Sequence, residues 1–94
     1  MIVSVPELKT HLRIQHNDED EYINTLIAQA QAAAEDFCRV LFENNAPEPV
    51  RLAVMLMASH YYENRDSPDK EAYLTMRMGF ENLLYPYRDV AKMF

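Results

Sequence analysis

The chain has 94 residues, a single glycine and a net charge of −6, from 9 Lys and Arg against 15 Asp and Glu. This length predicts one domain over residues 1–94, and the shortage of glycine disfavours an all-β fold, whose tight turns need residues with positive φ. The few, scattered cations disfavour a surface that grips duplex nucleic acid through its phosphates, and they disfavour an anionic membrane surface for the same reason.

Cysteine content and hydropathy indicate the compartment. Cys38 is the only cysteine, which excludes an internal disulfide, suits a reducing compartment and predicts a buried core position. Residues 1–6 lack the basic region and the long apolar run of a signal peptide, and the apolar run 52–58 is far shorter than the roughly 20 residues of a bilayer span. We expect a soluble protein that no classical signal exports.

The first two predicted helices begin at capping patterns. Ser4 and Glu7 form a capping box with Pro6 in the first turn, and they predict a short helix over about 5–13. Asn17 or Asp18 can cap the second helix, whose first turn is rich in carboxylates. That helix is predicted over about 18–43. Its apolar residues recur at helical spacing: Ile23, Leu26, Ile27, Ala30, Ala33, Ala34, Phe37, Cys38 and Leu41.

The second half of the chain predicts one long and one short helix. Residues 48–64 form a helix that is apolar on nearly every side, which is typical of a central helix or one that also contacts other subunits. Residues 65–70 carry turn residues and 71–77 fit either a loose helical turn or an extended segment, so we expect a loop over 65–78. A short helix over about 79–85 follows. The predicted fold is all-α, a compact bundle of two long antiparallel helices plus a short N-terminal and a short C-terminal helix.

No pattern predicts catalysis, and we expect neither an enzyme nor a cofactor. The sequence has no Gly-rich phosphate loop, nucleophile elbow or Cys-x-x-Cys motif. His60 and Glu63 are one helical turn apart and could supply two metal ligands, but a di-metal bundle also needs carboxylates on other helices. The acidic run 18–21 lacks the glycine and the spacing of a calcium loop. We therefore expect no metal site.

Tyrosines gather at the end of the third helix and around the last one. Because tyrosine joins a large apolar area to a hydroxyl group, such a cluster suits the edge of a core or an interface. We favour a cluster that locks the C-terminal helix to the long helices, with Arg65 pairing with Glu63 or stacking on the rings, over a direct partner site. The cluster is Tyr61, Tyr62, Glu63, Arg65, Tyr85, Tyr87 and Arg88. Candidate oligomer contacts, chosen for adaptable apolar side chains, are Met55, Met57, Met76, Met78 and Phe80.

The chain resembles the head–tail connector proteins of long-tailed phages and prophages, which are also called adaptor, head-completion or DNA-packaging proteins. The resemblance rests on VPELKTHLRI at 5–14 followed by the acidic residues 18–20, on SHYYENRD at 59–66 and on LLYPYR at 83–88. Residues 67–79 depart from the family's pattern of small residues and proline.

The resemblance implies a homo-oligomeric ring of about twelve copies that joins the portal to the tail-completion proteins. DNA would pass through the channel without specific binding, and the negative charge of the chain suits such a channel. The ring would lie at the head–tail junction of the virion, after the subunits have been in the host cytoplasm.

Two other functions remain open from the residues. The first is a small acidic prophage regulatory or toxin-neutralising protein that acts by protein–protein binding. The second is a helix-turn-helix DNA binder, which is disfavoured because the third helix offers only Arg51 and Arg65 around an apolar run.

Overall fold

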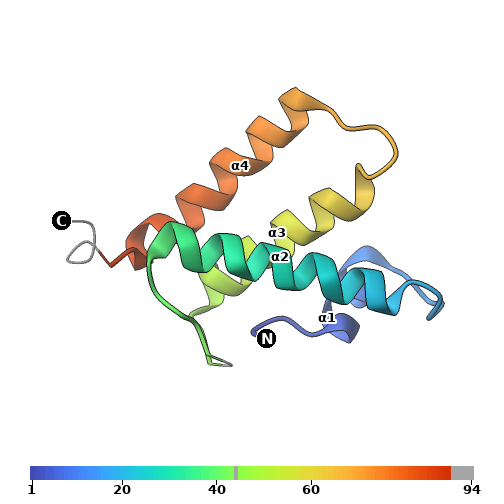
Figure 1. Cartoon of the computed structure of the whole chain (residues 1–94), viewed down its shortest axis with the longest axis horizontal. Coiled ribbons are helices and arrows are strands. Elements are labelled where there is room, and N and C mark those ends of the chain that lie inside the picture. The colour runs from blue at the N-terminus through green and yellow to red at the C-terminus, as the bar shows by residue number, and fades with distance from the viewer. Residues whose placement is uncertain (44, 90–94) are drawn as a thin grey trace.

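The computed structural model describes residues 1–43 and 45–89. Within these residues the chain is all-helical and has no strand, as the sequence predicts. Four α-helices and a terminal 3-10 turn follow one another along the chain (Figure 1): α1 (Val5–Leu12), α2 (Asp20–Cys38), α3 (Glu48–Glu63), α4 (Lys70–Leu84) and η1 (Tyr85–Tyr87).

Helix α1 begins at the capping box that the sequence predicts. The Glu7 N–H donates to the Ser4 hydroxyl at 3.2 Å, and the Ser4 N–H donates to the Glu7 carboxylate at 3.1 Å. The helix ends where Arg13 adopts a left-handed conformation with φ of 61°, and the Arg13 N–H bonds back to the Lys9 and Thr10 carbonyls. Leu8 is the buried residue of α1 and anchors it to the core.

Helix α3 lies between α2 and α4 and packs along both (Figure 1). This central position explains why its sequence is apolar on nearly every side, since one face meets α2 and another meets α4. Its buried apolar residues are Val50, Ala53, Val54, Met57 and Ala58. Small residues on α3, together with the buried Ala30 and Ala34 of α2, let the helix backbones approach closely.

Helix α2 ends at Cys38, five residues before the end predicted at 43. Arg39 adopts the left-handed conformation with φ of 58°, and its N–H donates to the Glu35 carbonyl. The Glu35 carboxylate then accepts a hydrogen bond from the Phe42 N–H at 2.9 Å. The segment after the helix is therefore held at Phe42 by a side-chain hydrogen bond instead of continuing the helix, although Leu41 keeps the apolar spacing of α2.

The largest correction concerns the predicted loop over 65–78 and the short helix over 79–85. Residues 70–84 form one continuous helix, α4, and the connection from α3 is short. The Asp69 carboxylate caps this helix by accepting hydrogen bonds from the Glu71 and Ala72 N–H groups. The bundle thus has three long helices, of 19, 16 and 15 residues, and not two.

The physical reason for this correction is packing against α3, which the ambiguous local sequence of residues 71–77 does not reveal. Glycine in a helix interior costs only about 1 kcal/mol relative to alanine, which tertiary packing readily offsets. Met76, Phe80 and Leu84 are buried at four-residue spacing on the α4 face that meets α3. Gly79 lies where α4 approaches Leu56 of α3. None of the helices in the described part of the chain is long and apolar enough to cross a membrane.

Candidate functional site

A hydrogen-bonded group, the Glu19 clasp, joins the start of α2 to the end of α3. It consists of Glu19, Tyr62 and Arg65. The Tyr62 hydroxyl donates to Glu19 Oε1 at 2.6 Å, and Arg65 Nη1 donates to Glu19 Oε2 at 2.5 Å. The Arg65 guanidinium also stacks on the Tyr62 ring, with its Cζ 4.3 Å from the ring centroid. Segments 43 residues apart in sequence are therefore fastened at one carboxylate.

The electrostatics of the clasp favour the ionised carboxylate. The Tyr62 hydrogen bond, followed by the Arg65 hydrogen bond, lowers the pKa of Glu19 below its ordinary value. In return, the hydrogen bond to Glu19 raises the pKa of Tyr62, because it favours the protonated hydroxyl. The partner of Arg65 is Glu19 and not the predicted Glu63, whose side chain is exposed.

Two further ionic anchors fasten the N-terminal segment. Lys9 Nζ bonds to Asp20 at 2.8 Å and to Asn17 at 2.6 Å, which closes the turn between α1 and α2. Arg51 of α3 pairs with Glu7 and donates through Nε to the Ile2 carbonyl at 3.1 Å. Neither anchor was predicted from the sequence, nor was the role of Glu19, because the acidic run was interpreted only as a solvated helix start. The opposite charge of Lys9 was the available signal.

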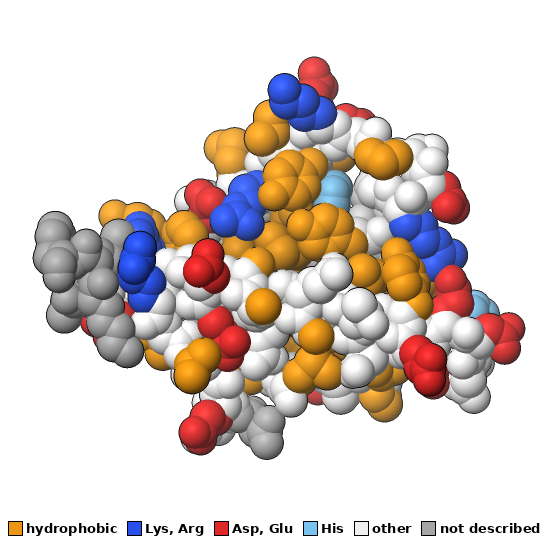
Figure 2. All heavy atoms as spheres, in the orientation of Figure 1, with side chains coloured by type: hydrophobic (Ala, Val, Ile, Leu, Met, Phe, Trp, Pro, Cys, Tyr) orange, Lys and Arg blue, Asp and Glu red, His pale blue; other side chains and the backbone are white. Residues whose placement is uncertain are grey.

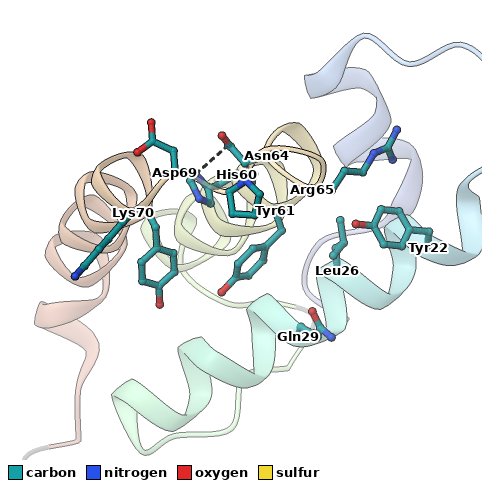
Figure 3. Close-up of a pocket in the computed structure, with 11 residues that line it drawn as sticks. Tyr22, Leu26, Gln29, His60, Tyr61, Asn64, Arg65, Asp69 and Lys70 are labelled. Atoms are coloured by element: carbon teal, nitrogen blue, oxygen red, sulfur yellow. Dashed lines mark hydrogen bonds between the residues drawn. The ribbon is translucent and has the colours of Figure 1, made fainter.

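An open groove lies between α2 and α4 where the two helices diverge from α3. We call it the tyrosine groove; it encloses about 610 Å³. Figure 2 shows apolar side chains gathered between α4 and α2, with basic side chains at either end of the patch. The lining residues are Tyr22, Leu26, Gln29, His60, Tyr61, Asn64, Arg65, Pro68, Asp69, Lys70 and Tyr73. Figure 3 shows Tyr22, Leu26 and Gln29 on α2 facing Tyr61 of α3 across this space.

The floor of the tyrosine groove is aromatic. The centroid of the His60 ring lies 5.9 Å from that of the Tyr61 ring and 6.0 Å from that of the Tyr73 ring. His60 Nδ1 is 3.3 Å from the Asn64 amide nitrogen. Burial, with a further contribution from Tyr73, raises the pKa of Tyr61, so its hydroxyl stays protonated at neutral pH. The described residues contain no group of three or more His, Cys, Asp or Glu side chains that could hold a metal ion. This chemistry suits packing and hydrogen bonding with a partner.

A family model for the phage gp6-like head-tail connector protein matches residues 2–89. The chain belongs to that family. It is thus a structural component of the phage virion that interacts with other head and tail proteins. Comparisons with curated proteins and with solved structures return no match.

The clasp gives the connector motifs a structural meaning. The acidic residues of 18–20 and the segment 59–66 carry the resemblance to the family from distant parts of the sequence. In the structure they meet at Glu19, through Tyr62 and Arg65. The segments on which the resemblance rests therefore include residues that attach α2 to α3 in this chain.

The predicted tyrosine cluster divides into two groups in this connector chain. Tyr61, Tyr62 and Arg65 lie at the end of α3, whereas Tyr85, Tyr87 and Arg88 follow the far end of α4 (Figure 1). The 15 residues of α4 separate the two groups by about 22 Å along the helix. The Arg88 guanidinium lies 4.7 Å from the Phe37 ring centroid and 5.5 Å from that of Tyr85. Arg88 thus contributes to packing against α2, remote from the clasp.

The candidate oligomer contacts also divide. Met57, Met76 and Phe80 are buried in the core, so we no longer propose them as contacts between connector subunits. Met55 is half-buried, and Met78 is 67% exposed. The exposed apolar side chains of Leu41, Leu52 and Leu74 were not among the predicted contacts.

Proposed function

We propose that this chain is the repeating subunit of a ring that joins the phage portal to the tail-completion proteins at the head–tail junction. The match of the connector family over residues 2–89 carries this proposal. The ring would contain about twelve copies related by rotation, and the subunits would be in the host cytoplasm before they assemble. DNA would pass through the channel of the ring during packaging and ejection.

The clasp and the ionic anchors support a load-transmitting structural role. A subunit between two machines must keep its shape while its outer surfaces bind neighbours. Glu19, Lys9 and Arg51 each tie segments that are distant along the chain. Such fastening reduces the freedom of the N-terminal segment and of the α2 start, so that the surfaces they carry stay in fixed relative positions.

The charge of the chain supports passage of DNA without specific binding. The net charge is −6, and at least four of the eight described Lys and Arg side chains pair with carboxylates: Lys9, Arg51, Arg65 and Arg77. A channel lined by such subunits would repel phosphates and leave the DNA free to slide. The charge thus favours a conduit over a DNA-gripping protein.

The proposal is tested by mixing the purified chain with purified portal complex from the phage or prophage that encodes it. Electron microscopy and native mass spectrometry should show a ring of additional mass on one face of the portal. Tail-completion protein should then bind the combined particle and not the bare portal. Failure of the chain to add to the portal at any concentration that keeps it soluble would contradict the proposal.

A further inference from the structure

Leu41 is an apolar side chain that the structure holds away from the core. It is 83% exposed, although it lies only three residues after Cys38, the buried end of α2. Its neighbours are held in place: the Val40 N–H donates to the Glu35 carbonyl at 3.3 Å, and the Phe42 N–H donates to the Glu35 carboxylate at 2.9 Å. The Phe42 carbonyl accepts from Gln31 at 3.4 Å. Leu41 is thus presented as a knob on a fixed segment.

The surroundings of this knob are acidic. Between residues 35 and 43 the chain carries three carboxylates, at Glu35, Asp36 and Glu43, and one guanidinium, at Arg39. These charges sum to −2, and both Asp36 and Glu43 are exposed. A surface that receives Leu41 should therefore combine an apolar hollow with cations at its rim.

The tyrosine groove has these properties on a chain that is acidic overall. Its lining includes two cations, Lys70 and Arg65, of which Arg65 is paired with Glu19 in the clasp, and one carboxylate, Asp69. The Asp69 carboxylate is occupied in capping α4, and Lys70 is exposed and has no ion-pair partner among the described residues. Tyr61 and Tyr73 supply the apolar wall. Aromatic floors with a charged rim are typical of the anchor pockets of protein interfaces.

The knob and the groove of one chain do not meet. Leu41 is absent from the groove lining and borders a separate hollow at the end of α2. Leu26 in the groove and Cys38 at the helix end are about 18 Å apart along α2. A Leu41 side chain that occupies this groove would therefore come from another molecule, and a contact between two different patches of one chain is a heterologous interface, the type that can close into rings.

We propose that the tyrosine groove of each subunit receives the Leu41 segment of the next subunit in the ring. This inference rests on the proposed ring function and assigns the two faces of its repeating contact. Leu41 enters between α2 and α4 of the neighbour, and Glu43 or Asp36 lies near Lys70. The contact repeats head to tail, so each subunit uses its knob on one side and its groove on the other.

The first test compares ring formation on the portal for three variants of the full chain. Leu41→Asp removes the knob, and Lys70→Glu reverses the groove charge at a helix start that tolerates carboxylates. Leu52→Ser is the matched control, because Leu52 is also an exposed leucine but lies on α3, away from both patches. Leu41→Asp and Lys70→Glu should each weaken ring formation at least about tenfold while the melting temperature of the monomer stays unchanged. Leu52→Ser should form rings like the wild type.

A mixture of the two defective variants tests the proposed contact most directly. The Leu41→Asp chain keeps its groove and the Lys70→Glu chain keeps its knob, so one intact contact can form between them. Size-exclusion chromatography should show a heterodimer in the mixture at concentrations where each variant alone is monomeric. No heterodimer, in a mixture whose wild-type counterpart forms rings, would overturn the inference.

A cysteine pair tests the direction of the contact. Oxidation of the Leu41→Cys, Gln29→Cys chain on the portal should give a ladder of covalent multimers, since each subunit is linked to two neighbours; Cys38 is buried and does not compete. A ladder that stops at dimers would overturn the head-to-tail arrangement.

The failures are distinguishable. If wild-type and Leu41→Asp chains form equal rings, the inference fails and the ring proposal stands. If Lys70→Glu alone prevents recruitment to the portal, the groove receives a portal or tail protein, and the inference is overturned. If the wild type never forms a ring, both proposals fail.

Discussion

Replacement of Gly79 by alanine tests whether α4 is a continuous helix. Alanine is favoured over glycine in a helix interior by about 0.8–1.0 kcal/mol. A Cβ atom at Gly79 would lie 3.4 Å from Leu56 Cδ2, which is close but ordinary contact with the end of a side chain. Gly79→Ala should therefore raise the free energy of unfolding by about 0.5–1 kcal/mol. For a domain of this size that corresponds to roughly 2–8 °C in melting temperature.

The assay is thermal and urea unfolding followed by circular dichroism, with an unchanged urea m-value. Ser67→Ala, in the exposed connection between α3 and α4, is the control and should change stability by less than about 0.5 kcal/mol. Gly79→Leu should have the opposite sign, because its side chain would overpack the contact with Leu56, at a cost of about 1–3 kcal/mol. If Gly79→Ala leaves stability unchanged or lowers it, residue 79 is not in the interior of a helix that packs on α3.

Three further predictions concern the clasp, the thiol and the charge. Because the clasp lowers the pKa of Glu19, its contribution to stability is present above the ordinary carboxyl pKa of 4.5 and is lost as pH falls through the folded value. Wild type should thus be more stable than Glu19→Gln at pH 7, and the gap should shrink towards pH 3; a gap that is the same at both pH values would contradict the clasp. Burial raises the pKa of the Cys38 thiol, so a thiol reagent at pH 8 should react with the native chain far more slowly than with the chain in urea, and equal rates would place Cys38 at the surface. Duplex DNA should show negligible affinity at physiological salt, and tight binding that weakens steeply with salt would instead support a DNA-binding regulator.

The local parts of the fold could be predicted because they depend on neighbouring residues. Residues close together in the sequence determine the Ser4 capping box, the apolar stripe of α2 and the central position of α3. The start of α4 was missed because the polar and apolar residues of 71–77 fit either a loose helical turn or an extended segment. Packing against α3 determines that residues 70–78 are helical, and local helix propensity does not reveal this packing.

The candidate site could be predicted only in its residue types. The tyrosines and Arg65 were singled out, yet their partners depend on which helices diverge and which approach. Glu19 accepts hydrogen bonds from Tyr62 and Arg65 because the start of α2 lies beside the end of α3. A single sequence does not reveal this tertiary relation. The groove requires the angle between α2 and α4, and the exposure of Leu41 requires the early end of α2 at Cys38.

The central claim is that this chain joins heads to tails, and a joining assay measures it most directly. Heads that carry portal and packaged DNA but lack this chain should not join purified tails. Addition of the purified chain together with tail-completion protein should restore joined, infectious particles, and electron microscopy should show the chain as a ring at the junction. Heads that join tails equally well without the chain, or restored particles without added density at the junction, would contradict the account.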